Sequence, residues 1–253
     1  MDRTRDISDS HRLGSSEVPR FRYRWIAFDA VGTLIYPETP VAVAYQAVAA
    51  RHGSLLTVVE FERCFRSAFQ YTEKNPFPGG PTTRNQFTKT NDEIEAARWR
   101  WIVHDLIHDL PDTEACFREL FDHFAKPESW KCFDDVEQTL ERLEQAGYRL
   151  AVASNFDSRL HRILDSLPEL RRISTRVISS DVGFRKPDPR FYEALTRCCD
   201  CTPDQVFMVG DSPEHDLAGP RAAGMSALLI KRSGYADKSR YVSSLNELAD
   251  RLC

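Results

Sequence analysis

Four short polar motifs stand along this chain, each directly after an apolar run and before a stretch with helix-like spacing. In an open parallel sheet, ligands bind at the carboxyl ends of the strands. We therefore expect the four motifs to meet at one edge of such a sheet and to form one site. The motifs are Asp29, Ser154-Asn155, Lys186-Pro187 and Gly210-Asp211-Ser212, in that order.

Asp29 is the candidate nucleophile. It ends the apolar run Tyr23 to Phe28 and precedes Gly32, which permits an unusual backbone turn. A carboxylate in that place can attack an electrophile and form a covalent ester or an acyl phosphate. The alternative role for this residue is to cap a helix or a turn.

Asp211 is the candidate metal ligand. It follows the apolar run Val206 to Val209, which in a doubly wound sheet can lie beside the strand that precedes Asp29. Two carboxylates that converge there need a cation, and magnesium prefers hard oxygen ligands in an octahedron. The alternative role for Asp211 is to cap the turn at Ser212-Pro213.

Lys186 and Ser154 supply further polar groups. Lys186 would neutralise charge between Asp29 and the transferred group, although an exposed position is the commonest fate of a lysine. Ser154 can donate a hydrogen bond to a phosphoryl or carboxylate oxygen, and neighbouring backbone N–H groups can help. Asn155 is expected either to bind the same group or only to shape the turn.

These motifs, in this order and context, resemble those of the haloacid dehalogenase superfamily, and the resemblance covers nearly the whole chain. It implies hydrolysis through a covalent intermediate on Asp29, with Mg²⁺ as the cofactor. The magnesium ligands that it implies are Asp29, Asp211 and the backbone carbonyl of Val31. It also places Ser212 and Asp216 just outside these ligands, with Asp216 as an outer ligand or as the holder of a metal-bound water.

Val31 departs from the pattern of that superfamily, in which the second residue after the nucleophile is usually an Asp that serves as general acid and base. Loss of an acid/base group typically costs about 10²–10⁴ in rate. Phosphatases of the superfamily have both that Asp and the metal-binding Gly-Asp pair, whereas 2-haloacid dehalogenases have a non-acidic residue there, work without metal and lack the pair. The pair Gly210-Asp211 favours a magnesium-dependent phosphatase that acts on a small phosphorylated metabolite. The alternatives are a metal-independent 2-haloacid dehalogenase-type hydrolase and a non-catalytic binding protein of this fold.

The alternation of strand and helix patterns predicts an α/β fold, with a Rossmann-like, doubly wound parallel sheet. Residues 37–127 are helical in pattern, which predicts an inserted helical-bundle cap with one apolar face per helix. Within it, the Pro- and Gly-rich loop Asn75 to Phe87 is either a lid over the substrate or a surface loop. We expect an N-terminal arm at residues 1–20 and a core at residues 21–36 and 128–253. The expected strands are Tyr23–Phe28, Tyr148–Ala153, Arg176–Ser180, Val206–Val209 and Ser226–Ile230.

The bulk properties exclude several classes of partner. A net charge of −4 gives no basic surface for nucleic acid, and no apolar run approaches the length that spans a bilayer. The polar N-terminus is not a secretory signal, and seven cysteines without a spaced framework are typical of the reducing cytoplasm. We expect a cytoplasmic protein with a small-molecule substrate. Neither the cluster Cys198, Cys199 and Cys201 nor the pair His104 and His108 has the spacing or the third ligand of a zinc site.

Overall fold

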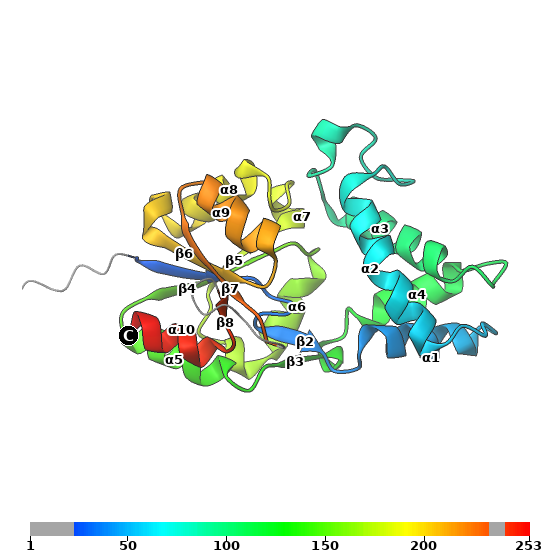
Figure 1. Ribbon diagram of the computed structural model, residues 1–253, viewed down its shortest axis with the longest axis horizontal. Coiled ribbons are helices and arrows are strands. Elements are labelled where there is room, and N and C mark those ends of the chain that lie inside the picture. The colour runs from blue at the N-terminus through cyan, green and yellow to red at the C-terminus, as the bar shows by residue number, and fades with distance from the viewer. Residues whose placement is uncertain (1–22, 233–240) are drawn as a thin grey trace, which may run out of the picture.

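The computed structural model describes residues 23–232 and 241–253, so the predicted arm at residues 1–20 lies outside the described part. The described chain folds around a parallel sheet of six strands in the order β5-β4-β1-β6-β7-β8 (Figure 1). The predicted parallel α/β sheet is confirmed, and the short strand β8 is an addition to it. The strands are β1 (Trp25–Phe28), β4 (Arg149–Ser154), β5 (Thr175–Ile178), β6 (Val206–Gly210), β7 (Ser226–Ile230) and β8 (Tyr241–Val242).

Strand β1 is central, and its register places the motifs. Phe28 lies opposite Val152 of β4 on one side and opposite Val209 of β6 on the other. The carboxyl ends of the three strands therefore lie at the same edge of the sheet, with β4 two residues longer and β6 one residue longer than β1 at that edge. The backbone N–H of Asp29 donates to the carbonyl of Val209 at 2.8 Å, so Asp29 itself stays attached to the neighbouring strand.

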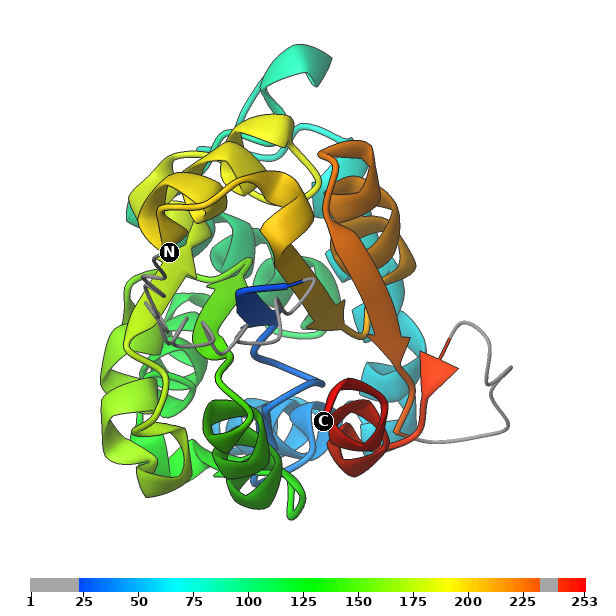
Figure 2. The ribbon, with the colours of Figure 1, turned by 90° about the vertical axis from the view of Figure 1, so that its left-hand side faces the viewer.

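Helices cover both faces of the sheet (Figure 2). Ile26 and Phe28 face one core, which α5, α6 and α10 complete, whereas Trp25 and Ala27 face the other, which α8 completes. All of β1 is buried, and this explains its continuous apolar sequence. The helices of this part are α5 (Val136–Gln145), α6 (Arg159–Ser166), α7 (Ser179–Val182), α8 (Pro189–Cys199), α9 (Gly219–Ala222) and α10 (Leu245–Leu252).

Four further helices lie beside the sheet and share an apolar core of their own (Figure 1). An antiparallel pair, β2 (Ile35–Pro37) and β3 (Trp130–Cys132), carries the chain out to these helices and back. Because the helices have their own core, we propose that residues 37–127 are a separate cap. They are α1 (Val41–Arg51), α2 (Val58–Lys74), α3 (Asp92–Leu106) and α4 (Glu114–His123). None of the helices in the described ranges is long and apolar enough to cross a membrane.

Local sequence signals explain several element ends. Thr57 and Glu60 form a capping box at the start of α2. The strand expected over Arg176–Ser180 stops earlier, at Ile178, because the hydroxyl of Ser179 bonds to the backbone of a neighbouring loop and the chain turns into α7. Short helical turns fill other connections: η1 (Arg84–Gln86), η2 (Pro127–Ser129), η3 (Pro168–Leu170), η4 (Pro203–Gln205) and the π-helical turn η5 (Pro213–Ala218).

The loop at residues 75–87 leads into a segment that is tied to the sheet part. Residues 88–90 pair with residues 183–185 through two backbone hydrogen bonds of 2.8 and 3.1 Å. The C-terminal end of the loop is therefore held next to Lys186. Its action as a lid stays a prediction.

Asp188 joins the helix α8 to that segment, and this generates a prediction about stability. Its carboxylate caps α8 by accepting from the backbone N–H of Arg190 at 3.0 Å, and it also accepts from the side chains of Arg190 and Thr88. The hydrogen bonds from the Arg190 guanidinium are the main reason why the pKa of Asp188 falls to about 2. We expect Asp188→Ala to lower the free energy of unfolding at pH 7 by about 1–2 kcal/mol, as loss of a good cap does.

Because the pKa is lower in the folded protein than in the unfolded chain, this stabilisation is complete above pH ~4 and disappears as the pH falls toward 2. Urea unfolding at several pH values should therefore show a gap between wild type and variant that narrows below pH ~4. Asp188→Asn is the matched control, since Asn also caps helices but carries no charge. A gap that stays constant down to the lowest pH would contradict the assignment.

Candidate active site

The ammonium group of Lys186 is the centre of the site. It donates to the Oδ1 atom of Asp29 at 2.9 Å, to the carbonyl of Ala153 at 2.8 Å and to the Oδ1 atom of Asp216 at 2.6 Å. These three contacts use all three of its donors. Lys186 is 1% exposed, and burial alone would lower its pKa, but the carboxylates of Asp216 and Asp29 outweigh burial and raise the pKa. The lysine therefore stays charged and joins β1, β4 and η5.

Asp29 has one oxygen atom that is held and one that is free. Its Oδ1 atom accepts from Lys186 and, at 3.1 Å, from the hydroxyl of Ser154. Its Oδ2 atom accepts no hydrogen bond from the residues that the structure describes. Burial raises the pKa of Asp29, and the charge of Lys186 opposes that rise. The arrangement orients the carboxylate and leaves one oxygen for attack on an electrophile.

Asp211 and Asp216 bring two more carboxylates to the same place. Asp29, Asp211 and Asp216 each offer an oxygen atom, and these atoms lie within 4.8 Å of one another. Asp216 is fully used, because its second oxygen accepts from the backbone N–H of Ser212 at 3.0 Å. Asp211 is the exposed member of the three, and desolvation together with the charges of Asp29 and Asp216 raises its pKa to about 7.

This cluster fits a divalent cation. Three carboxylates face a single ammonium, so the site carries a surplus of negative charge. Asp29 and Asp211 are the two carboxylates with oxygen atoms that are not already held, and hard oxygen ligands of this kind suit Mg²⁺. Asp216 and Ser212 are joined by the hydrogen bond from the backbone N–H of Ser212 to the carboxylate of Asp216. The hydroxyl of Ser212 also accepts from the backbone N–H of His215, which begins the turn η5.

Gly32 makes room for Asp211. It has φ = +85°, a left-handed conformation that glycine adopts readily. A Cβ atom at this position would lie 2.5 Å from the Oδ2 atom of Asp211. The absence of a Cβ atom at Gly32 therefore permits both the left-handed turn after β1 and the position of the Asp211 carboxylate.

The side chain of Asn155 contacts the backbone of Lys186. Its side-chain Oδ1 accepts from the backbone N–H of Lys186 at 2.7 Å, and its Nδ2 donates to the carbonyl of Lys186 at 2.9 Å. Both amide atoms thus fix the backbone that carries the lysine. Asn155 therefore acts on the position of Lys186, and contact of its amide with substrate stays a prediction.

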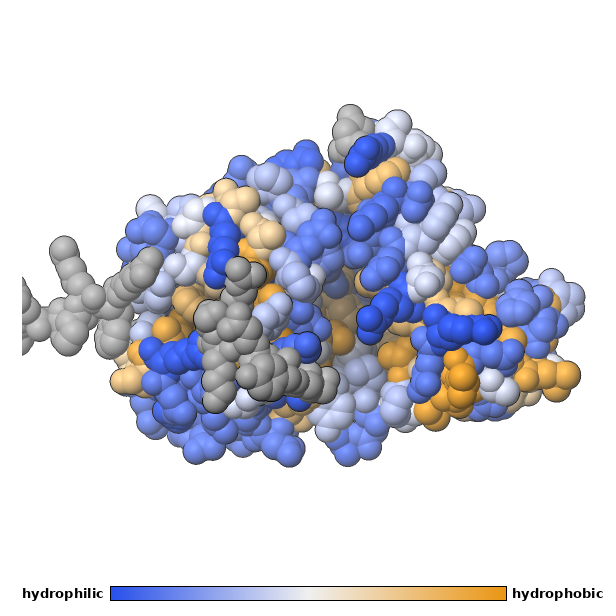
Figure 3. Space-filling model, viewed as in Figure 1, coloured by the Kyte–Doolittle hydropathy of each residue, from blue (hydrophilic) through white to orange (hydrophobic). Residues whose placement is uncertain are grey.

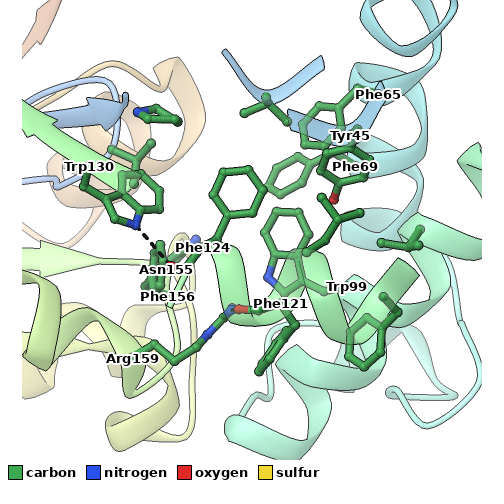
Figure 4. A pocket seen from close by; sticks show the side chains of 16 residues that line it. Tyr45, Phe65, Phe69, Trp99, Phe121, Phe124, Trp130, Asn155, Phe156 and Arg159 are labelled. Atoms are coloured by element: carbon green, nitrogen blue, oxygen red, sulfur yellow. Dashed lines mark hydrogen bonds between the residues drawn. The ribbon is translucent and has the colours of Figure 1, made fainter. Parts of the chain in front are cut away.

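Val31 lies in the wall of a cavity of about 270 Å³ between the end of β1 and the helices α1 to α4. Figure 3 shows hydrophobic side chains in the hollow between the two parts of the molecule. Most of the lining is aromatic, and Figure 4 shows these side chains converging from both parts. The sequence predicts Phe65 and Phe69 only as the packed face of a helix, since a face toward a cavity and a face toward a core have the same spacing.

A second group that the sequence did not reveal lies on the other side of Lys186. Arg185 and His215 of the sheet part approach the carboxylate of Glu73 at the end of α2, at 3.4 and 3.6 Å. Burial, together with the charges of Arg185 and Lys186, lowers the pKa of His215 to about 3, so this imidazole is neutral. The group connects the helical part to the loop that carries Lys186. The sequence gives only one indication of this group of three residues, which is that Arg185 directly precedes Lys186.

Comparison with known proteins agrees with this architecture. A family model described as haloacid dehalogenase-like hydrolase matches residues 23–224. Haloacid dehalogenase-like hydrolase domain-containing protein 3 of Mus musculus is 32% identical over 228 residues, which cover 87% of this chain and 86% of that protein. Among solved structures, a HAD phosphatase from Thermococcus onnurineus has a TM-score of 0.61 at 21% identity and covers 90% of this chain and 97% of its own. An L-2-haloacid dehalogenase from Xanthobacter autotrophicus has a TM-score of 0.67 at 14% identity, with coverage of 90% and 97%. The two structures share the fold with this chain and carry different chemistry.

The contact between Gly32 and Asp211 can be tested against a matched glycine. Gly53 has φ = +96°, and a Cβ atom there would have nothing within 4 Å, so Gly53→Ala introduces backbone strain without a clash. We expect Gly32→Ala and Gly53→Ala to lower the free energy of unfolding by similar amounts, about 1–2 kcal/mol for a left-handed alanine. Only Gly32→Ala must displace the Asp211 carboxylate, so only that variant should bind Mg²⁺ more weakly in calorimetric titration. Equal Mg²⁺ affinities in the two variants would refute the role of Gly32.

Proposed function

This chain belongs to the haloacid dehalogenase-like hydrolases, and we propose that it is a magnesium-dependent phosphatase that acts on a small phosphorylated metabolite. The proposal rests on one observation, the convergence of Asp29, Asp211 and Asp216 on a single lysine at the edge of the sheet. A surplus of negative charge around a nucleophile would repel a phosphate ester. A bound cation removes that repulsion, which makes the cluster useful for phosphoryl transfer and of little use for the expulsion of a halide.

In the proposed reaction, the free Oδ2 atom of Asp29 attacks the phosphorus atom. A bond forms between Oδ2 and phosphorus as the bond from phosphorus to the ester oxygen breaks, and that oxygen leaves with the electron pair. Water then attacks phosphorus and the bond from phosphorus to Oδ2 breaks, which restores the Asp29 carboxylate. The inorganic phosphate leaves with the protons of that water, and the departed ester oxygen takes its proton from solvent. Lys186 holds Asp29 in place and balances charge, and Ser154 keeps the Oδ1 atom turned away from the phosphorus.

Asp29, Asp211 and the backbone carbonyl of Val31 would hold the magnesium ion, with Asp216 and Ser212 behind them. When bound, the ion neutralises the carboxylates and the phosphoryl oxygens. A change of side chain at Val31 leaves the carbonyl ligand in place. The sites for the metal and for the nucleophile thus depend on Asp211 and Asp29 and not on the identity of the Val31 side chain.

Val31 removes the residue that would protonate the leaving oxygen. A valine has no proton to transfer, and general acid/base catalysis is worth about 10²–10⁴ in rate. The proposed phosphatase is therefore slow on esters of ordinary alcohols. It is less affected on esters whose leaving oxygen is stable as an anion.

A second candidate function, 2-haloacid dehalogenation, is favoured by Val31 and by the apolar cavity that this residue lines. Halide leaves as an anion and needs no proton, so the absence of a general acid costs nothing in that reaction. The surplus of carboxylates argues against it. A protein that has kept the fold without turnover is the third alternative, and the experiment below separates all three.

The proposed function predicts magnesium-dependent release of phosphate. Wild-type protein should hydrolyse an aryl phosphate with added Mg²⁺ and lose this activity in a chelator, and Asp29→Asn should abolish it. Asp211→Asn should weaken Mg²⁺ binding in calorimetry, because the variant loses one of the two free carboxylates. Release of chloride from 2-chloropropionate in the presence of a chelator would instead support the dehalogenase. A folded protein with neither activity would support the non-catalytic alternative.

A second prediction concerns the missing acid. Val31→Asp should restore the proton donor for the leaving group and raise the rate on alkyl phosphates by up to about 10²–10⁴, with a smaller gain on aryl phosphates. Repulsion between the new carboxylate and Asp29 would reduce the gain. Val31→Asn is the matched control, since it has nearly the same shape and cannot act as an acid. A folded Val31→Asp protein that binds Mg²⁺ and gains on no phosphate ester would count against the phosphatase.

A further inference from the structure

The aromatic cavity is lined in part by the sequence neighbours of the proposed nucleophile and of Ser154. Val31 comes two residues after Asp29, Asn155 comes directly after Ser154, and both line the cavity. The remaining wall comes largely from helices α1 to α4, with aromatic side chains that include Phe65, Phe69 and Trp99 (Figure 4). A group bound in this cavity would rest against Val31, two residues along the chain from Asp29.

The polar atoms in the cavity wall are mostly occupied. The guanidinium of Arg159 donates to the carboxylate of Asp157 and to the carbonyl of Phe121. The indole N–H of Trp130 donates to the carbonyl of Phe124 at 3.1 Å. Asn155 is held by the backbone of Lys186, as described above. The charged residue of the described lining, Arg159, is thus already paired with Asp157 and keeps two of its five N–H groups.

Two uncharged donors remain as well. The hydroxyl of Tyr45 and the indole N–H of Trp99 line the cavity and have no hydrogen-bond partner among the described residues. Burial raises the pKa of Tyr45 well above its usual value, so the hydroxyl keeps its proton and can donate. A sugar or another ligand rich in hydroxyl groups would lose most of its hydrogen bonds to water in such a place. A flat apolar ring with one or two acceptor atoms has few hydrogen bonds to water to lose, so its burial in the cavity costs little.

Building on the proposed phosphatase, we propose that the substrate is a phosphate ester of a phenol-type hydroxyl, whose aromatic ring occupies this cavity. Two independent observations agree on this class: the aromatic lining accepts a ring, and Val31 cannot protonate the oxygen that leaves. A phenol has a pKa of about 10, whereas water, and hence a simple alcohol, is near 16. A phenolate can therefore depart with the electron pair of the broken phosphorus–oxygen bond and take its proton from solvent later.

The test uses phenylphosphonate, which cannot be hydrolysed, and n-butylphosphonate as the aliphatic counterpart. In calorimetry with Mg²⁺ present, the wild type should bind phenylphosphonate at least about tenfold more tightly than n-butylphosphonate, since stacking on aromatic side chains favours the ring. Trp99→Ala should remove most of this preference. Trp101→Ala is the matched control, because Trp101 lies on the same helix but stacks on Tyr71 at 4.8 Å, away from the cavity. Trp99→Leu keeps apolar volume and serves if the alanine variant fails to fold.

The same variants are then assayed on phenyl phosphate and on glycerol phosphate. The proposal expects a higher kcat/KM on phenyl phosphate, lowered selectively in Trp99→Ala and unchanged in Trp101→Ala. Equal kcat/KM values on both esters, together with equal binding of both phosphonates, would overturn the aromatic substrate and leave the phosphatase in place. Binding of phenylphosphonate that depends on Trp99, without hydrolysis of any phosphate ester, would overturn the phosphatase and support the cavity as a site for aromatic ligands.

Discussion

A buried lysine between two buried carboxylates is the interaction on which the rest of this structure depends. Lys186 is buried away from bulk solvent and keeps Asp29 and Asp216 close, and the three residues come from different segments of the chain. Removal of one partner from such a group typically costs about 3–5 kcal/mol, because the remaining charge is left buried and unpaired. The same contacts that stabilise the edge of the sheet therefore also orient the proposed nucleophile, Asp29.

The site has a strongly charged side and an apolar side, and Asp29 stands between them. On one side are the carboxylates of Asp211 and Asp216, and on the other is the aromatic cavity that begins at Val31. An acidic residue at the position of Val31 would connect the two sides through a proton. Val31 has no ionisable group, so in the proposed reaction only the carboxylate side of the site can neutralise charge that develops. This division explains why the same site has features of two reaction classes.

The sequence predicted the sheet and the meeting of the motifs because both depend on local order. An apolar run that ends in a polar residue marks the end of a strand, and the parallel register of β1 with β4 and β6 then brings these ends together. The cavity could not be predicted in this way. Phe65 and Phe69 repeat at helical spacing, and only the distance between the helices and the sheet decides whether they face a core or an opening. The contact of Asn155 with Lys186 joins residues 31 positions apart and has no local signal. Strands β2 and β3 are each three residues long, too short for a periodic pattern.

The pairing of Pro37 with Trp130 means that the helical segment leaves and rejoins the chain at one point. The two ends of the segment are therefore held at a fixed separation by the sheet part, whatever lies between them. An exchange of the intervening helices for others of different length would leave the strands and their charged edge connected as before. The helices that line the aromatic cavity can thus vary while the carboxylates and the lysine at the edge of the sheet stay in place. The helical segment and the charged edge of the sheet can therefore change independently of each other.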